Sequence, residues 1–279
     1  MEIEALTSSF SLDIQEKSRS FQDTGMSYDN LINTVLRDYK IYSFTQCMDR
    51  PRSIERPLFQ YKETDYEFLK RVASYLGLQL ICDTINPDNV FYFGTPSDKY
   101  YKLEEDIDYT ASIDIKKYRQ LSASTADIHP TDFFYYTIKS KKVIDIGSIV
   151  NFKGKELYVN SYEAEYIRGE LVFTYKLCRK KGIWQEKLYN EKLKGISLEG
   201  EVLEVSGEQV KLHLNIDETQ DQSKAAWFRY APPTGNLMYS MPIVGTSANL
   251  YFPSERSNDP LVIGCVRKNG SSSEKFSND

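Results

Sequence analysis

The alternation of apolar and polar residues between positions 196 and 268 is the feature that most constrains the fold. Apolar Val210, Leu212 and Leu214 alternate with polar Lys211 and His213, and this period of two predicts strands with one buried face. Four or five strands within about 70 residues predict a small closed or nearly closed barrel, because closure removes exposed strand edges. Glycines and prolines interrupt the pattern at short spacings, as turns between strands do: Gly207, Pro232, Pro233, Gly235, Gly245 and Pro253.

Two helices are predicted nearer the N-terminus. Ser27 is suited to cap the first, whose buried side carries apolar residues spaced three and four apart: Tyr28, Leu31, Ile32, Val35, Leu36 and Tyr39. The second helix begins at Thr64, where Thr64 and Glu67 match a capping box. It ends at Gly77, because glycine tolerates the left-handed conformation after a helix. Its buried stripe is predicted to be Phe68, Leu69, Val72, Ala73 and Leu76.

A hairpin is predicted after the second helix, with strands at 78–82 and 90–93 around Asn86-Pro87-Asp88-Asn89. These elements form a small α/β unit over residues 15–96. From 97 to 190 the pattern is mostly β, and Gly154 and Gly169 indicate hairpin turns. The strand candidates there are 113–115, 135–138, 148–152, 157–159 and 171–175.

Three groups of residues, in order along the chain, carry a family resemblance. Arg19 to Asp23 reads R-S-F-Q-D, and Glu63 to Leu69 reads E-T-D-Y-E-F-L. Together with the third group they resemble the VgrG-type spikes and phage baseplate hub proteins of contractile injection systems. The third group lies in the predicted barrel: Gly200, Val202, Trp227, Tyr230, Ala231, Met241, Pro242, Gly245, Tyr251, Phe252 and Pro253.

The resemblance implies a mainly β fold with a small α/β unit, in which a tube-type β-barrel domain is followed by a C-terminal OB-fold-like barrel. Residues 1–96 would form the hub α/β unit with a short remnant of a preceding barrel. Residues 97–194 would form the second hub barrel plus a linker, 195–270 the OB-fold-like domain, and 271–279 a disordered tail. Against the family the chain looks shortened at both ends, before the R-S-F-Q-D motif and after the OB-fold-like domain.

Composition argues against several classes of protein. A net charge of −5 gives no reason to expect nucleic acid as a partner. The four cysteines form no C-x-x-C pair and the chain has two histidines, so no metal or other cofactor is expected. The N-terminus lacks the apolar segment of a secretory signal, and no run of 18 apolar residues could span a membrane. We therefore expect synthesis in the cytoplasm without a signal peptide, and assembly into a virion tail or injection particle.

No catalytic, cofactor-binding or metal-binding residues are predicted. The sequence contains no G-x-S-x-G, P-loop or H-E-x-x-H motif. A glycan hydrolase would need paired carboxylates, and carboxylates cluster at Glu104-Glu105-Asp106 and Asp217-Glu218. Both clusters lie in polar, turn-like stretches, which favours solvated loop charge. His213, on the polar side of its strand, and His129, in a loop, are expected at the surface or an interface.

The function implied by the resemblance is structural. The chain would be a baseplate hub or spike-base protein of a phage, a phage-derived bacteriocin or a related injection system. It would form a homotrimer, with the hexameric tail tube protein above, baseplate wedge proteins around it and the needle tip below. It would meet a membrane only through the piercing of a target cell. Two alternatives remain open: a tail-associated peptidoglycan hydrolase component, or an OB-fold module that binds glycan or nucleic acid.

Overall fold

The computed structural model describes residues 6–39, 43–83, 89–96, 99–103, 107–123, 128–232, 241–256 and 259–266. Strands in four sheets dominate these ranges, which contain three α-helices, and the predicted mainly β class is confirmed. The chain divides into two compact units. The first, here the sheet unit, contains Met1–Leu12, Tyr39–Arg50 and Tyr66–Leu188; the second, the barrel unit, contains Asp13–Asp38, Pro51–Asp65 and Tyr189–Asp279.

The domain borders predicted from the sequence run in chain order, with breaks after residues 96, 194 and 270. The two compact units instead interleave, and the second takes segments from both ends of the chain. The three-domain division therefore stays a prediction. Its last element, the tail 271–279, lies outside the described residues.

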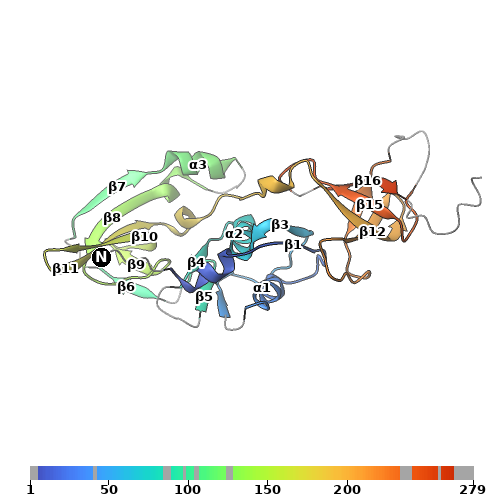
Figure 1. Cartoon of the computed structure of the whole chain (residues 1–279). Helices are drawn as coiled ribbons and strands as arrows, with labels where there is room; N and C mark the ends of the chain where they lie inside the picture. Colours follow the sequence, from blue (N-terminus) through green and yellow to red (C-terminus); the bar gives the residue numbers. More distant parts are fainter. Residues whose placement is uncertain are drawn as a thin grey trace, which may run out of the picture. The chain divides into compact units, whose positions relative to one another are not determined.

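The barrel unit contains a closed five-stranded barrel (Figure 1). Neighbouring strands are antiparallel except β14 and β16, which are parallel. The predicted small closed barrel is thus confirmed. Around the barrel the strands follow the order β12 (Ser197–Ser206), β13 (Gln209–Leu214), β14 (Trp227–Tyr230), β16 (Leu261–Val266) and β15 (Ser247–Tyr251).

The alternation in β13 has the predicted result on its inner face, where Val210, Leu212 and Leu214 are fully buried. On the outer face Lys211 is also buried, because its ammonium lies 2.9 Å from Glu204 and 4.7 Å from the centre of the Trp227 ring. Close strand approach explains the glycine of β12: a Cβ at Gly200 would lie 2.6 Å from the carbonyl oxygen of His213.

The same unit contains a two-stranded sheet and one helix. Strand β1 (Glu16–Phe21) pairs antiparallel with β3 (Leu58–Thr64). Helix α1 (Tyr28–Leu36) begins as predicted, with the Ser27 hydroxyl accepting a hydrogen bond from the Asn30 amide at 3.2 Å. The helix ends at Leu36, so Tyr39 does not lie on it.

In the sheet unit, helix α2 (Asp65–Tyr75) buries Phe68, Leu69, Val72 and Ala73, as predicted, whereas Leu76 lies after the end of the helix and is only half-buried. Gly77 follows with φ of 71°, whereas the capping box of Thr64 and Glu67 stays a prediction. The predicted hairpin pairs β4 (Leu80–Cys82) with β5 (Asn89–Phe93), and its turn lies outside the described residues. Strand β2 (Ser43–Gln46), which the sequence did not predict, pairs parallel with β5.

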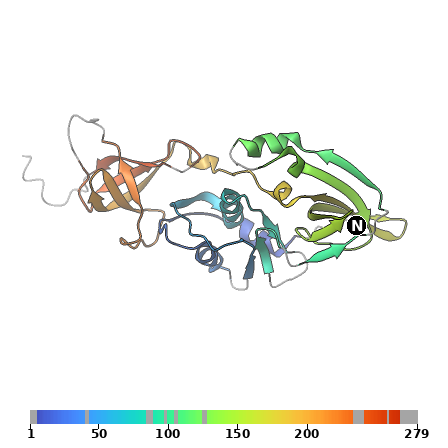
Figure 2. The ribbon, with the colours of Figure 1, turned by 180° about the vertical axis from the view of Figure 1, so that it is seen from behind.

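A six-stranded sheet makes up the rest of this unit (Figure 2). Both predicted hairpin turns are present, with positive φ at Lys153 and Gly154 and at Arg168 and Gly169. The strand order is β6 (Tyr100–Lys102), β9 (Ile149–Phe152), β10 (Lys155–Ile167), β11 (Glu170–Cys178), β8 (Phe134–Ser140) and β7 (Tyr109–Ile113). The described ranges also contain short 3-10 helices, at Ser8–Asp13, Pro130–Phe133, Lys180–Ile183 and Glu191–Leu193.

The sheet curls toward a barrel. Tyr109 on β7 and Phe152 on β9 have ring centres 5.5 Å apart, although three strands separate β7 from β9 in the sheet order. Within the described ranges the backbone pairing does not close, since β6 and β7 form the two edges. The predicted second barrel is therefore a curled open sheet.

One strand prediction was wrong. Residues 113–115 do not form a strand: Ile113 ends β7, and helix α3 (Ile115–Ser122) follows directly. The cause is local, because the Asp114 carboxylate accepts a hydrogen bond from the Lys117 amide at 2.9 Å and so caps the helix.

Candidate functional site

Strand β1 joins the motif-bearing segments to the barrel within the barrel unit. Four polar residues on and just after this strand make the contacts, and we call them the β1 clamp: Lys17, Arg19, Ser20 and Gln22. The two basic residues contact Asp65, in the second motif, and the two neutral residues contact the barrel. Side chains of the R-S-F-Q-D motif therefore point alternately to two sides of the strand: Arg19 contacts Asp65, and Ser20 and Gln22 contact the barrel.

Asp65 is the buried anchor of the clamp, with its side chain 0% exposed. Its carboxylate lies 2.5 Å from the Arg19 guanidinium and 2.8 Å from the Lys17 ammonium. The buried amide of Gln60 donates a further hydrogen bond at 2.9 Å. A buried carboxylate is tolerated when it is paired and hydrogen-bonded in this way.

Asp38 extends the ion cluster toward solvent. Its carboxylate lies 2.5 Å from Lys17 and 3.6 Å from Arg19, and its side chain is half exposed. The hydrogen bond from Lys17 holds the pKa of Asp38 below its ordinary value.

Ser20 attaches β1 to the loop after β13. Its backbone amide and its hydroxyl each donate a 2.5 Å hydrogen bond to the Asp217 carboxylate. Burial raises the pKa of Asp217 above its ordinary value, and the bonds from Ser20 oppose that shift. This carboxylate is thus held in place as a structural acceptor.

Gln22 attaches the end of β1 to the barrel wall. Its buried amide nitrogen donates to the Leu212 carbonyl at 3.2 Å, and its amide oxygen accepts from the Ala226 backbone amide at 3.3 Å. One side chain therefore links β13 to the segment entering β14. Two buried backbone groups are satisfied by it.

The partner strand of β1 enters the barrel core. Phe59 on β3 is fully buried and belongs to the same hydrophobic cluster as the barrel interior. Its ring lies edge-on to Phe252, with centres 4.9 Å apart, and 6.2 Å from Phe228. The β1–β3 pair is thus joined to the barrel by polar bonds on one strand and apolar packing on the other.

The predicted absence of a catalytic site remains a prediction, because Glu104, Glu105 and Asp106 lie outside the described residues. Asp217 is committed to Ser20, while its neighbour Glu218 is exposed. The ring nitrogen Nε2 of His213 lies 3.0 Å from the Asp217 carbonyl oxygen. His129 is exposed, as expected, and its backbone amide donates a hydrogen bond to the Asp132 carboxylate at 3.0 Å ahead of a 3-10 helix.

The surroundings of the Cys178 thiol and of the other potential metal ligands also give no sign of a reactive site among the described residues. Burial raises the pKa of the Cys178 thiol to about 12, so it stays protonated at neutral pH. Among the described residues, no group of three or more His, Cys, Asp and Glu side chains is placed to hold a metal ion. No helix in the described part of the chain is long and apolar enough to cross a membrane.

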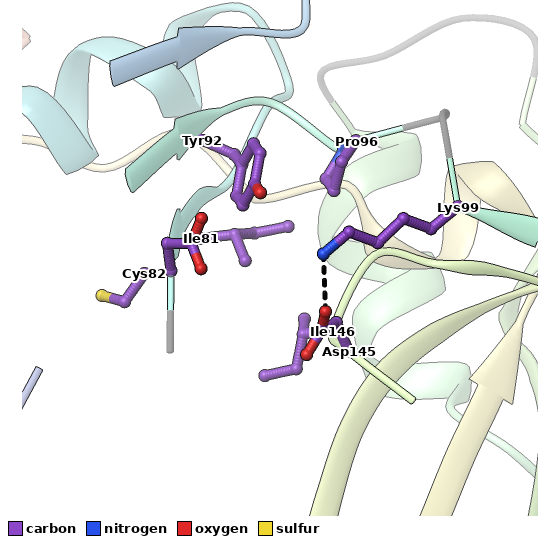
Figure 3. Close-up of a pocket in the computed structure, with 8 residues that line it drawn as sticks. Ile81, Cys82, Tyr92, Pro96, Lys99, Asp145 and Ile146 are labelled. Carbon is purple, nitrogen blue, oxygen red and sulfur yellow. Dashed lines mark hydrogen bonds and ion pairs between the residues drawn. The ribbon is translucent and has the colours of Figure 1, made fainter. Parts of the chain in front are cut away.

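A small cavity in the sheet unit lies beside an ion pair (Figure 3). Lys99 and Asp145 face one another there at 2.7 Å, and the hydrogen bond that Lys99 donates to the Asp145 carboxylate raises the pKa of Lys99. The cavity measures about 20 Å³, which is room for about one water molecule. It is too small for a substrate.

Arg19, Ser20 and Gln22 belong to the R-S-F-Q-D motif, whereas the sequence analysis did not single out Lys17 and did not predict the partners of any clamp residue. Gln60 and Asp217 are separated from the motif by many residues, so no local pattern connects them to it. The signal that could have been used is the strand period, which puts Lys17 and Arg19 on one side of β1 and Ser20 and Gln22 on the other.

No family model matches the sequence, and no curated protein matches it. Several solved structures match part of the chain, and two of them are tail proteins. The tail protein from Neisseria meningitidis MC58 is 11% identical, with 62% of this chain and 72% of that chain covered and a TM-score of 0.44. The 43 kDa tail protein of prophage MuSo2 from Shewanella oneidensis is 11% identical, with 63% and 73% covered and a TM-score of 0.44. Neither match assigns a role to this chain.

Proposed function

We propose that this chain is a structural protein of a contractile tail or a related injection system, a baseplate hub or spike base that joins the tail tube to the needle. The observation that carries the proposal is the β1 clamp. Two motifs of the hub resemblance, separated in sequence, meet at Arg19 and Asp65, and the same strand bonds to the barrel through Ser20 and Gln22. A part that transmits force needs such cross-linking between its elements.

The barrel supports the same proposal. Numbered along the chain, its strands follow the order 1-2-3-5-4 around a closed barrel, which is consistent with the OB-fold that the resemblance implies. In a hub protein this domain would present the needle.

Exposed apolar side chains favour a role in an assembly. Tyr166 and Leu171 lie directly opposite one another near the tip of the β10–β11 hairpin and are 77% and 47% exposed. The hairpin extends beyond the neighbouring strands in both views (Figures 1 and 2). We propose that such surfaces contact further copies in a homotrimer, the hexameric tube protein above or the wedge proteins around it.

The alternative of a peptidoglycan hydrolase has less support. Asp217 is bonded to Ser20 and is not available as a free acid. We propose that the chain is not an enzyme, uses no cofactor, and reaches its particle from the cytoplasm.

Light scattering of the purified full-length protein tests the proposal. A mass of three copies is expected. A monomer at high concentration would contradict the trimer on which the hub assignment depends.

A further inference from the structure

The outer face of β13 and β14 carries a hollow of about 360 Å³ that lies entirely within the barrel unit. Its size falls in the range of about 300–1,000 Å³ found for small-molecule sites. One wall is the Trp227 indole, which is 37% exposed. Pro57, Ala225 and Ala226 add apolar surface, and Asp23 and Lys224 add polar groups.

The position of this hollow is favourable for a ligand. In five-stranded barrels of this kind, the face of the second and third strands is a common binding surface for oligosaccharides and oligonucleotides. Here those strands are β13 and β14, and Trp227 lies directly opposite Lys211 across them.

The charges of the hollow are paired within the protein. Lys211 contacts the Glu204 carboxylate at 2.9 Å, the Gln222 carbonyl at 3.0 Å and the Trp227 ring. Lys224 lies 3.4 Å from Asp23. Because each lysine has an acidic partner, the site offers little attraction to a phosphate backbone, which needs uncompensated basic charge.

We propose that this hollow binds a neutral sugar of a glycan chain. An aromatic wall with an apolar margin suits the C–H face of a pyranose ring. The Asp23 carboxylate accepts and the Lys224 ammonium donates hydrogen bonds, as sugar hydroxyls require. This binding goes beyond the proposed structural role and does not depend on it.

The experiment uses the full chain with Trp184→Phe, so that Trp227 alone reports fluorescence. Tri-N-acetylchitotriose and maltotriose are titrated to millimolar concentration, with a thymidine oligonucleotide and heparin as charged probes. Saturable binding of a neutral trisaccharide, with a shift of the Trp227 emission to shorter wavelength, is expected. Trp227→Ala should weaken binding, measured by calorimetry, by about tenfold or more, since the stacking surface is lost.

Trp227→Phe provides a second variant if the alanine variant does not fold, with an intermediate loss expected. Asp23→Asn should also weaken sugar binding, whereas Tyr166→Ala, at an exposed aromatic residue elsewhere, should leave it unchanged. Three results would overturn the proposal: no saturable binding of either trisaccharide, binding by the Trp227 variants as tight as that of the protein with Trp227, or saturation by the oligonucleotide or heparin instead.

Discussion

The guanidinium of Arg19 lies 2.5 Å from the carboxylate of Asp65, whose side chain is completely buried. The two residues are 46 positions apart in the sequence. Lys17 contacts the same carboxylate at 2.8 Å. The contact holds Asp65, directly after β3, against β1, and β1 is connected to the barrel through Ser20 and Gln22.

Removing the anchor should be costly. Asp65→Ala leaves Lys17 and Arg19 without their shared buried partner, and the free energy of unfolding should fall by about 3–5 kcal/mol. Urea unfolding followed by circular dichroism measures it. The matched control is Asp49→Ala, which breaks an ion pair with Lys180 whose side chains are 88% and 51% exposed; a change within about 1 kcal/mol is expected. Equal losses in the two variants would show that the buried pair has no special role.

Gln22→Ala should also destabilise the protein. It leaves the Leu212 carbonyl and the Ala226 amide without their side-chain partner, at a cost of about 1–3 kcal/mol for each group that stays dry. The control is Gln220→Ala, whose side-chain bond to the Asp221 carbonyl is exposed to solvent. If Gln22→Ala unfolds at the same urea concentration as wild type, water replaces the amide and the clamp is weaker than its geometry indicates.

Asp217 should give the protein a distinctive pH dependence. Burial raises its folded pKa above the ordinary value of 3.8, so the folded state binds the proton more tightly than the unfolded state. Its contribution to stability is therefore full below 3.8 and is lost as pH rises through the folded pKa. As pH rises over that range, the free energy of unfolding of wild type should fall relative to that of Asp217→Asn.

Asp38 should give a pH dependence of stability with the opposite sign, which serves as an internal comparison. The hydrogen bond from Lys17 lowers its folded pKa, so its contribution is present above 3.8 and is lost as pH falls through the lowered value. Measured against Asp38→Asn, wild type should lose its advantage on acidification. The same sign of pH dependence for both variants would contradict the assigned surroundings of one carboxylate.

The sequence predicted correctly those elements that depend on residues close together in the chain. The alternation around Val210 and Leu212, the serine cap at Ser27 and the glycine of the turn at Gly169 each correspond to an observed feature. The helix after Asp114 was missed because a short run of alternating residues is ambiguous between strand and helix.

Long-range pairings could not be predicted from the sequence. Strand β2 pairs with β5 across more than one intervening element, and Asp217 meets Ser20 at a separation of 197 residues. Such contacts depend on how distant elements pack against one another. The local sequence around each residue carries no pattern that identifies its partner. The hollow beside Trp227 was missed for the same reason, since its walls come from four separate segments.

Phe59 provides a test of the apolar connection to the barrel. Phe59→Ala removes a fully buried ring from the core that it shares with Phe252 and Phe228, and a loss of about 3–5 kcal/mol is expected. Thermal unfolding by calorimetry measures it. Phe10→Ala, at a ring that is 49% exposed, is the control and should cost far less. Similar effects of the two substitutions would mean that β3 does not contribute to the barrel core.

The role that we propose, in which the chain joins a tail tube to its needle, is tested most directly by electron cryomicroscopy of particles purified from the parent source. We expect three copies around the tail axis at the end of the tube, with the five-stranded barrel on the side of the needle. Absence of the chain from the particle, or its presence away from the axis, would contradict the account.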